Sequence, residues 1–532
     1  MKRRKFLKKT YLASASTFVV PTIIPSGLLT NTYANSKINI GQIGCGRIAR
    51  FHDIPGVMKH DNARVVAVCD VDNKRLNDAR LLVENFYNKK NETNNFLDIK
   101  TYDNYNELLE NKDIDAVVIS TPDHWHAQPA IEASLKGKDV YLQKPTSLTV
   151  SEGRILSDII KKNSTILQVG TQQRSMPQFR IAAELVRNGR IGELHTVKVG
   201  LPGDPSGPVF SGMPVPKNLN YDMWLGQTPH IDYTEIAVHP MLDYSRPGWL
   251  RIEQFGSGMI TGWGQHHYDS AAWGMNTELT GPKSVEAVAE FPKSGLWNVH
   301  GDFMSKAEYE NGVTMFTSSG GYTNGIKYIG TEGWIFVSRG NYTASASDPV
   351  SAEKSSKVLD ASDKKILNPI SNSDRIHLYK SDDHHGNWLD CIVNRKTPIS
   401  TIEVGHRVCT VCLITHISMK LNRRLYWNPQ KEQFIKLGLD YEILKATSIQ
   451  DISNKTFVKH YMDWQRPLSN TEVACYFSHK SAWNKVIKTD QPALILEDDA
   501  LLSKCVPELL KSFTNKKNVD FINLEVAGRK KW

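Results

Sequence analysis

The stretch KINIGQIGCGRIA, residues 37–49, joins an apolar strand directly to a glycine-containing turn. Gly44 permits a tight turn, Gly46 allows the backbone to approach a pyrophosphate, and the small Ala49 allows the next helix to pack on the strand. The pattern predicts a dinucleotide-binding Rossmann domain, and the alternative is a glycine turn in an α/β protein that binds no nucleotide. The turn residues assigned to cofactor binding are Gly44, Gly46, Arg47 and Ile48.

A second apolar strand, residues 63–70, supports the nucleotide-binding interpretation. It ends in Asp70, at about the 20-residue distance from the glycine turn at which a carboxylate binds a ribose 2′-hydroxyl. An acid at this place favours NAD over NADP as the cofactor.

Two further apolar runs, residues 113–120 and 139–142, predict strands of a buried parallel sheet, with a helix at 128–136 between them. Loops at the carboxyl ends of such strands line the ligand crevice. Lys144 follows the later strand at the expected nicotinamide end, where it contacts the cofactor and holds a substrate hydroxyl or relays a proton. An ordinary surface lysine is the alternative. The cofactor-binding residues predicted in the earlier loop are Thr121, Pro122, His124 and His126.

The composition changes after about residue 165, and from there to residue 434 it is rich in aromatic residues and glycine. Strand patterns at 193–199, 313–316 and 333–337 predict a mostly antiparallel open sheet with one face covered by helices. The expected architecture is therefore α/β, with a Rossmann domain at 37–160 followed by an α/β domain at 161–434.

A histidine pair lies in the stretch GWGQHHYDSAAWG, residues 262–274. A spacing of three places His266 and Asp269 on one face of a helix. Histidine titrates near neutrality, so His266 is a candidate acid or base, and Asp269 is a candidate to orient it.

The N-terminus, residues 1–36, has an arginine pair followed by Phe-Leu-Lys and then a moderately apolar run interrupted by prolines. This pattern resembles a twin-arginine export signal, with a general secretory signal or a membrane anchor as alternatives. We expect export to the periplasm, with only transient membrane contact, and an exported protein that uses NAD must fold around it first.

A chain of 532 residues is expected to contain at least two folded units. Six of its basic residues precede residue 10, so the formal charge of +9 comes mainly from the N-terminus. The rest of the chain is nearly neutral, and no nucleic-acid partner is expected. Seven scattered cysteines form neither a disulfide framework nor a zinc ligand set, and core packing is their expected role.

Residues 37 to about 434 resemble the Gfo/Idh/MocA oxidoreductase family in its exported bacterial branch. The motifs that carry the resemblance are GQIGCGRIA, TPDHWHA, QKPTS, QVGTQQRS, GWGQHHYD and HHGNWLDCIVNRKTPISTIEVGHR. It implies a Rossmann domain, a substrate domain whose open sheet often forms a homo-oligomer interface, a motif lysine at Lys144 and a catalytic histidine at His266. Many members have an aspartate four residues before that histidine, where this chain has Gly262.

Two enzymatic functions fit these residues, both acting on a sugar or glycoside with NAD and without a metal. In one, NAD accepts a hydride from a sugar carbinol while His266 or Lys144 accepts the hydroxyl proton. In the other, which resembles the NAD-dependent glycosidases of the family, transient oxidation at carbon 3 permits elimination of the aglycone, and the hydride then returns. A sugar-binding protein without catalysis is the third hypothesis.

The sequence from residue 435 to residue 532 resembles glycosyltransferase family 25, the lipopolysaccharide-type sugar transferases. The matching stretches are KLGLDYEIL, LSNTEVACYFSH and ALILEDDA. An apolar strand that ends in consecutive carboxylates suits a divalent metal and a sugar diphosphate, with Asp498 as the candidate ligand. The opening nucleotide-binding strand of that family is absent, so we expect a truncated α/β segment without transferase activity.

Overall fold

The computed structural model describes residues 37–91, 98–207, 209–340 and 357–435. The chain divides into two compact units at Ile435, and the description below concerns the first unit. The predicted export signal at 1–36 and the glycosyltransferase-like segment with Asp498 lie outside the described residues. Within the described ranges, no helix combines the length and the apolarity needed to cross a membrane.

The first layer is a six-stranded parallel sheet in the order β3-β2-β1-β4-β5-β6, as expected for a Rossmann domain. Its central strands β4 and β5 are buried throughout because helices cover both faces of the sheet. The strands are β1 (Ile38–Ile43), β2 (Ala63–Cys69), β3 (Lys100–Tyr102), β4 (Ala116–Ile119), β5 (Asp139–Leu142) and β6 (Leu167–Val169). The strand order reverses between β1 and β4, which is where such sheets bind ligands.

The helices of the Rossmann domain begin where the sequence supplies caps. The Asp72 carboxylate accepts a hydrogen bond from the Lys74 amide at 2.8 Å, and Thr149 and Glu152 form a reciprocal capping box. The helical segments are η3 (Ala49–Asp53), α2 (Ile54–Met58), α3 (Asn73–Lys90), α4 (Tyr105–Glu110), η4 (Asp123–Trp125), α5 (Ala127–Leu135) and α6 (Val150–Asn163).

The Rossmann domain extends beyond the boundary at residue 160 that the composition predicts. Strand β6 closes its sheet, and helix α11 (His384–Asn394) returns from far along the chain to place Trp388 and Leu389 in the core of this domain. The change of composition precedes β6, so it marks the boundary before the sheet is complete.

The second layer is a mixed sheet in the order β13-β12-β11-β7-β10-β9-β8-β14-β15. Within this sheet, β7 and β10 are the parallel pair and the other paired strands of the described residues run antiparallel, so the predicted mostly antiparallel sheet is confirmed. The strands are β7 (Leu194–Leu201), β8 (Ser284–Ala289), β9 (Phe303–Glu308), β10 (Thr314–Ser319), β11 (Gly325–Gly330), β12 (Gly333–Val337), β13 (Leu359–Ala361), β14 (Leu425–Asn428) and β15 (Gln433–Phe434).

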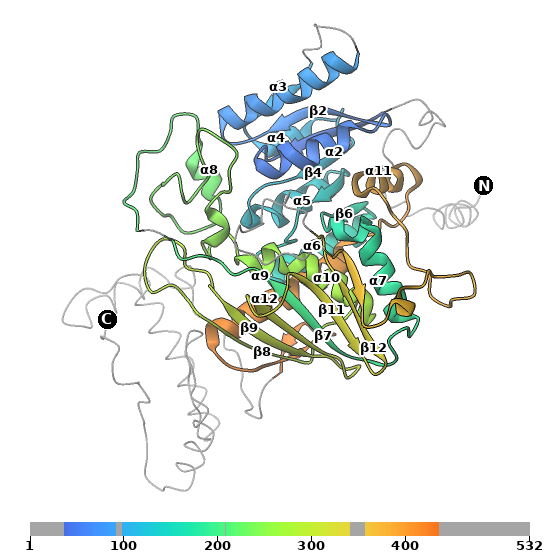
Figure 1. Ribbon diagram of the computed structural model, residues 1–532. Coiled ribbons are helices and arrows are strands. Elements are labelled where there is room, and N and C mark those ends of the chain that lie inside the picture. The colour runs from blue at the N-terminus through green and yellow to red at the C-terminus, as the bar shows by residue number, and fades with distance from the viewer. Residues whose placement is uncertain (1–36, 92–97, 208, 341–356, 436–532) are drawn as a thin grey trace, which may run out of the picture. The chain divides into compact units, whose positions relative to one another are not determined.

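Helices α10 (Gly264–Met275) and α12 (Ile402–Leu421) lie between the two sheets (Figure 1). Every residue of α10 is buried, so the helix that carries His266 has a fixed position. The cysteines of the described chain are buried and unpaired, as expected for core packing. The other helical segments are η5 (Gln172–Ser175), α7 (Pro177–Arg187), α8 (Tyr221–Leu225), η6 (Trp249–Arg251), α9 (Met259–Gly262) and η7 (Lys364–Leu367).

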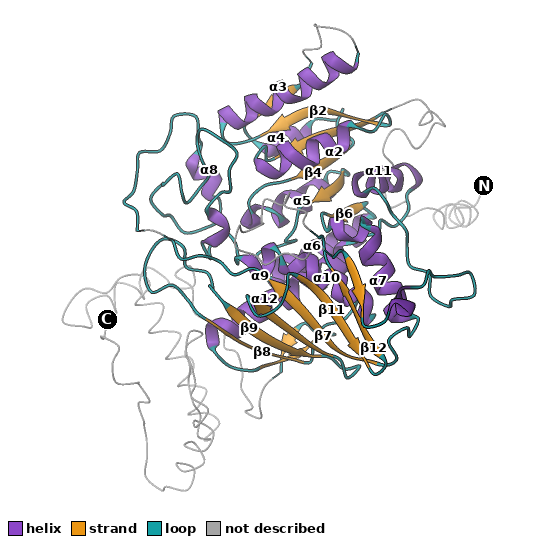
Figure 2. Ribbon diagram, viewed as in Figure 1, coloured by secondary structure: helices purple, strands orange, loops and turns teal. Residues whose placement is uncertain are grey.

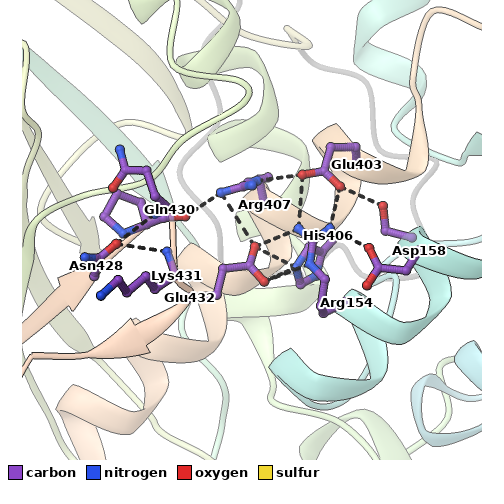
Figure 3. A network of polar contacts seen from close by, with 11 residues as sticks. Arg154, Asp158, Glu403, His406, Arg407, Asn428, Gln430, Lys431 and Glu432 are labelled. Atoms are coloured by element: carbon purple, nitrogen blue, oxygen red, sulfur yellow. Dashed lines mark hydrogen bonds and ion pairs between the residues drawn. The ribbon is translucent and has the colours of Figure 1, made fainter. Parts of the chain in front are cut away.

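A polar network fastens the β14–β15 hairpin to helices α6 and α12 (Figure 3). The Glu432 carboxylate accepts hydrogen bonds from Arg154 at 2.8 Å and contacts the His406 imidazole at 3.0 Å. Arg154 also pairs with Glu403, which in turn accepts from Arg407 at 2.8 Å. Burial opposes ionisation of Glu432, but the hydrogen bonds from His406 and Arg154 outweigh it and hold the pKa well below its usual range.

Replacement of Glu432 by glutamine is expected to destabilise the fold by about 2–3 kcal/mol at pH 7, because it removes one of the two carboxylates that pair with the partly buried Arg154 and Arg407. The pKa of Glu432 is lower in the folded protein than in the unfolded chain, where it is near 4.5. The ionised carboxylate therefore stabilises the fold above that pH, and this stabilisation is lost as the pH falls. Urea unfolding at pH 7 and at pH 4 should therefore show a smaller difference in E432Q than in wild type. Exposed Lys431→Gln is the matched control, and an unchanged unfolding midpoint in E432Q would contradict the expectation.

Candidate active site

A cavity of about 610 Å³ lies at the carboxyl ends of the Rossmann strands. Its lining combines the glycine turn and the β2, β4 and β5 loops with residues of the second domain, among them Gly262, His266 and Arg339. The volume suits a cofactor or substrate, and the position is the one that the strand order favours.

The glycine turn has the backbone geometry predicted from the sequence. Gly44 has a φ of +80°, and a Cβ there would lie 2.8 Å from the Ser120 carbonyl carbon, so no other residue fits. A Cβ on Gly46 would meet nothing within 4 Å, because this residue faces the open cavity. Arg47 and Ile48 also line the cavity, as predicted.

Asp70 follows β2 and lines the same cavity. Its carboxylate accepts the backbone N–H groups of Cys45 at 2.7 Å and of Asp72 at 2.8 Å, which fixes it beside the glycine turn. Burial raises the pKa of Asp70 despite these two hydrogen bonds. Each oxygen retains a lone pair for a hydroxyl donor, as required of a ribose-binding acid.

A segment of the second domain crosses this end of the cavity, and we call residues 239–247 the strap. It belongs to the long loop region between β7 and α9 (Figure 2). The His239 imidazole contacts the Asp72 carboxylate at 2.8 Å, and Arg75 donates to the Pro240 carbonyl at 2.7 Å. Arg47 donates to the Tyr244 carbonyl at 2.9 Å. His239, Ser245 and Pro247 of the strap thus line the cavity together with the Rossmann turn.

Most residues of the TPDHWHA loop that were predicted to bind the cofactor line the cavity. Thr121, Pro122 and His126 line it, and the His126 Nε2 lies 2.9 Å from the Thr121 carbonyl oxygen. Burial lowers the pKa of His126 to about 4, so its imidazole is neutral.

His124 is not part of the cavity lining, contrary to its predicted role in cofactor binding. Its side chain turns to Trp224, whose carbonyl oxygen lies 2.9 Å from the His124 Nε2, and it packs against Phe255. The loop forms a short helical turn at 123–125, which directs alternate side chains to different sides.

Lys144 and His266 meet in the cavity from different domains. The Lys144 ammonium donates to the Gly262 carbonyl oxygen at 2.9 Å, one turn before His266. Burial lowers the pKa of His266 well below its usual value, with the positive charges of Arg339 and Lys144 acting in the same direction. The neutral imidazole presents a buried Nδ1 that has no hydrogen-bond partner among the described residues.

The structure corrects the role predicted for Asp269. Its two carboxylate oxygens accept hydrogen bonds from the Arg174 guanidinium at 2.7 and 2.8 Å, and it does not line the cavity. Arg174 also pairs with Glu278 at 2.9 Å and stacks on Trp273. Asp269 is therefore a structural partner of Arg174 rather than an orienting group for His266.

Sequence reasoning missed three further side chains of the cavity. The Arg339 guanidinium lies over the Trp263 ring, 4.7 Å from its centroid, and lines the cavity beside His266. His384 and His385, from the start of α11, line it from the Rossmann side. The adjacent histidines of the HHGNWLDC motif were a signal for this position.

Comparison with known proteins gives matches to both domains. The profile described as "Oxidoreductase family, NAD-binding Rossmann fold" matches residues 38–171, and that described as "Oxidoreductase family, C-terminal alpha/beta domain" matches residues 208–348. The chain belongs to the Gfo/Idh/MocA oxidoreductase family. A third profile, "Glycosyltransferase family 25 (LPS biosynthesis protein)", matches residues 413–532, in agreement with the sequence resemblance.

Curated relatives of this Gfo/Idh/MocA protein include Oxidoreductase P35 of Formosa agariphila, 32% identical over 164 residues, which are 31% of this chain and 47% of that protein. Myo-inositol 2-dehydrogenase of Thermotoga maritima is 29% identical over 188 residues, 35% of this chain and 51% of the enzyme. The chain thus spans about half the length of these relatives. The WlbA dehydrogenase of Bordetella pertussis, solved with NADH and UDP-GlcNAcA, has the same fold, with a TM-score of 0.51 at 17% identity over 74% of this chain and 99% of that one.

The cavity of this Gfo/Idh/MocA protein fits NAD. The open space at Gly46 admits a pyrophosphate, and the fixed Asp70 carboxylate is placed for a ribose hydroxyl. NAD is therefore the cofactor of the Rossmann domain.

Asp70→Ala is expected to weaken NAD retention by about 10-fold or more, because it removes a charged acceptor of the ribose hydroxyls. The measurement is the nucleotide released by denaturing protein purified without added cofactor. Asp61→Ala, which removes an exposed acid that precedes β2, is the control. Recovery of NADP, or of no nucleotide from wild type, would contradict the assignment.

Proposed function

We propose that the protein is an NAD-dependent oxidoreductase that transfers a hydride between a sugar carbinol and the nicotinamide. The observation that carries the proposal is that Lys144 and His266 line the same cavity as the dinucleotide-binding turn. The names of relatives support a polyol or sugar substrate, since one is a myo-inositol 2-dehydrogenase and one structural neighbour binds UDP-GlcNAcA.

NAD, when bound, supplies the hydride acceptor. Gly44 and Gly46 would hold its pyrophosphate, and Asp70 its adenosine ribose. Lys144 holds the substrate hydroxyl and relays its proton, a role that suits an Nζ positioned by the Gly262 carbonyl. His266, kept neutral by burial, positions the same hydroxyl through a ring nitrogen. Arg339, which lies over the Trp263 ring, lines the cavity with these two residues.

A second candidate function is the NAD-dependent glycosidase, and the strap favours it. A dinucleotide enclosed between the glycine turn and residues 239–247 would exchange slowly, which suits a reaction in which the hydride returns to the product. Export by the twin-arginine route, proposed from residues 1–36, would favour it too, since the periplasm holds no soluble NAD pool.

Two further proposals concern the oligomeric state and the C-terminal segment. The outer face of the second sheet exposes Val288 and Met304, and this supports homo-oligomerisation through the open sheet. The glycosyltransferase-like segment is proposed to be inactive, as its sequence lacks the opening nucleotide-binding strand of the family.

The two enzymatic functions differ in products. The full chain is incubated in deuterated water with myo-inositol, free aldoses and a panel of aryl glycosides, while NADH absorbance and aglycone release are followed. A dehydrogenase forms NADH stoichiometrically and leaves glycosidic bonds intact. A glycosidase releases aglycone without net NADH and incorporates deuterium at carbon 2, because elimination requires loss of that proton.

The same assay with Lys144→Met separates enzymatic turnover from contaminating activity. Absence of both signals across the panel, in protein that carries NAD, would overturn the oxidoreductase proposal for these substrates and favour the sugar-binding alternative.

A further inference from the structure

The strap, residues 239–247, is a loop whose two ends are fixed in the second domain. Val238, just before it, is fully buried in a cluster of aromatic and aliphatic side chains. Gly248, just after it, packs so closely that a Cβ there would lie 1.7 Å from the Ile236 carbonyl oxygen. The strap itself contains neither helix nor strand, so its position depends on the side-chain contacts that it makes.

Tyr244 anchors the strap to the Rossmann domain. The guanidinium groups of Arg50 and Arg75 lie over its ring, 4.8 and 4.5 Å from the centroid. The half-buried Tyr244 also donates its hydroxyl to the Asp78 carboxylate at 3.0 Å. Cations over the face of an aromatic ring attract it, so these contacts favour the closed position of the strap.

Arg75 holds the strap backbone as well. Its guanidinium donates to the Pro240 carbonyl at 2.7 Å and to the Asp243 carbonyl at 3.2 Å. The side chain of Arg75 is only 6% exposed, and the Asp72 carboxylate lies 3.9 Å from its Nε. A buried cation needs acceptors, and the strap provides two of them, so opening of the strap carries a free-energy cost.

The strap joins the two segments of the Rossmann domain that hold the cofactor. Arg47, in the glycine turn, donates to the Tyr244 carbonyl at 2.9 Å. The His239 imidazole contacts Asp72 at 2.8 Å, two residues beyond Asp70. The strap therefore runs from the pyrophosphate-binding turn to the ribose-binding acid, and it lines the cavity there.

We propose that the strap is a cofactor clasp, which Tyr244 and Arg75 hold closed across the adenosine end of the NAD site. NAD enters and leaves only when the clasp opens. The contacts that close it link two parts of the protein and do not use the cofactor, so the clasp slows entry as well as release. The proposal rests on NAD as the cofactor and holds for either of the two reactions proposed above.

This mechanism has a kinetic signature. Tyr244→Ala removes both ring contacts and the hydroxyl hydrogen bond, so the rate constants for NAD association and dissociation should both rise by about 10-fold or more. The Kd should then change by less than about threefold, because the two effects cancel. Asp70→Ala removes a group that would contact the cofactor, and it should raise the dissociation rate constant with little change in association.

Both rate constants are measured on the full-length chain. Association is followed by stopped-flow tryptophan fluorescence after the bound NAD has been removed with activated charcoal. Dissociation is followed by exchange of bound NAD for radiolabelled NAD, with the protein separated on a desalting column at timed intervals. Amide hydrogen exchange should become faster at residues 242–246 in Tyr244→Ala and stay unchanged in β1, which distinguishes an open clasp from general unfolding.

Two matched variants complete the experiment. Tyr244→Phe keeps the ring and loses only the hydrogen bond to Asp78, so both rate constants should rise by about two- to threefold. Leu242→Ala changes a strap side chain that is 90% exposed, and both rate constants should match those of wild type.

Unchanged rate constants in Tyr244→Ala, together with faster amide exchange in the strap, overturn the clasp and leave the NAD assignment intact. A rise in the dissociation rate constant alone also overturns it and makes Tyr244 an ordinary cofactor contact. If Tyr244→Ala loses protection throughout the fold, Tyr244→Phe decides, since its two rate constants must rise together. Wild type that binds no NAD overturns both the cofactor assignment and the clasp.

Discussion

Replacement of His266 by alanine, or of Lys144 by methionine, is expected to reduce turnover by about 10²–10⁴-fold while the protein still carries NAD. Both side chains line the cavity at the end remote from Asp70, and neither belongs to the glycine turn that would hold the pyrophosphate. The loss should therefore appear in kcat rather than in cofactor content.

The matched control for His266 is its neighbour. His267 is equally buried, but its Nε2 contacts Asn324 at 2.6 Å and it does not line the cavity, so His267→Gln should keep turnover per folded molecule. NADH or aglycone formation and the NAD released on denaturation are measured on each variant. Wild-type rates in His266→Ala would refute the role assigned to this residue.

Asp269→Ala is expected to destabilise the fold by about 3–5 kcal/mol, the usual cost of leaving one member of a buried ion pair alone. The Arg174 guanidinium would keep only Glu278 as an acidic partner, in a site where the side chains of Arg174 and Asp269 are 3% and 1% exposed. Turnover per folded molecule should remain near wild type, because the cavity does not include Asp269.

Urea unfolding and turnover at a temperature well below the transition separate the two effects. Glu278→Gln is the control, since this partner is 20% exposed and its loss should cost less. A variant D269A with wild-type stability, reduced turnover and a shifted pH profile would restore the orienting role that the helical spacing suggested.

The Rossmann half of the site could be predicted because its determinants are local. The φ of Gly44, the open space at Gly46 and the acid at the end of β2 follow from a short stretch of backbone and from strand order. Lys144 was predicted by the same rule, as a residue of a loop at a carboxyl strand end.

The remainder depends on contacts between residues far apart in sequence. A helical period places His266 and Asp269 on one face, yet it cannot reveal that Arg174, 95 residues away, binds Asp269. The strap reaches Arg75 across 165 residues, a contact that no local pattern indicates. Pattern analysis identified the chemistry of these side chains and could not identify their partners.

A further polypeptide segment can follow residue 435 without disrupting the packing of the oxidoreductase unit. The last charged group of the polar network is Glu432, and the final backbone hydrogen bond of the hairpin runs from the Ile435 amide to the Tyr426 carbonyl at 2.8 Å. The glycosyltransferase profile begins at residue 413, inside α12, whereas the fold places residues 413–435 in the oxidoreductase unit. A segment appended after residue 435 therefore leaves the hairpin and its polar network in place.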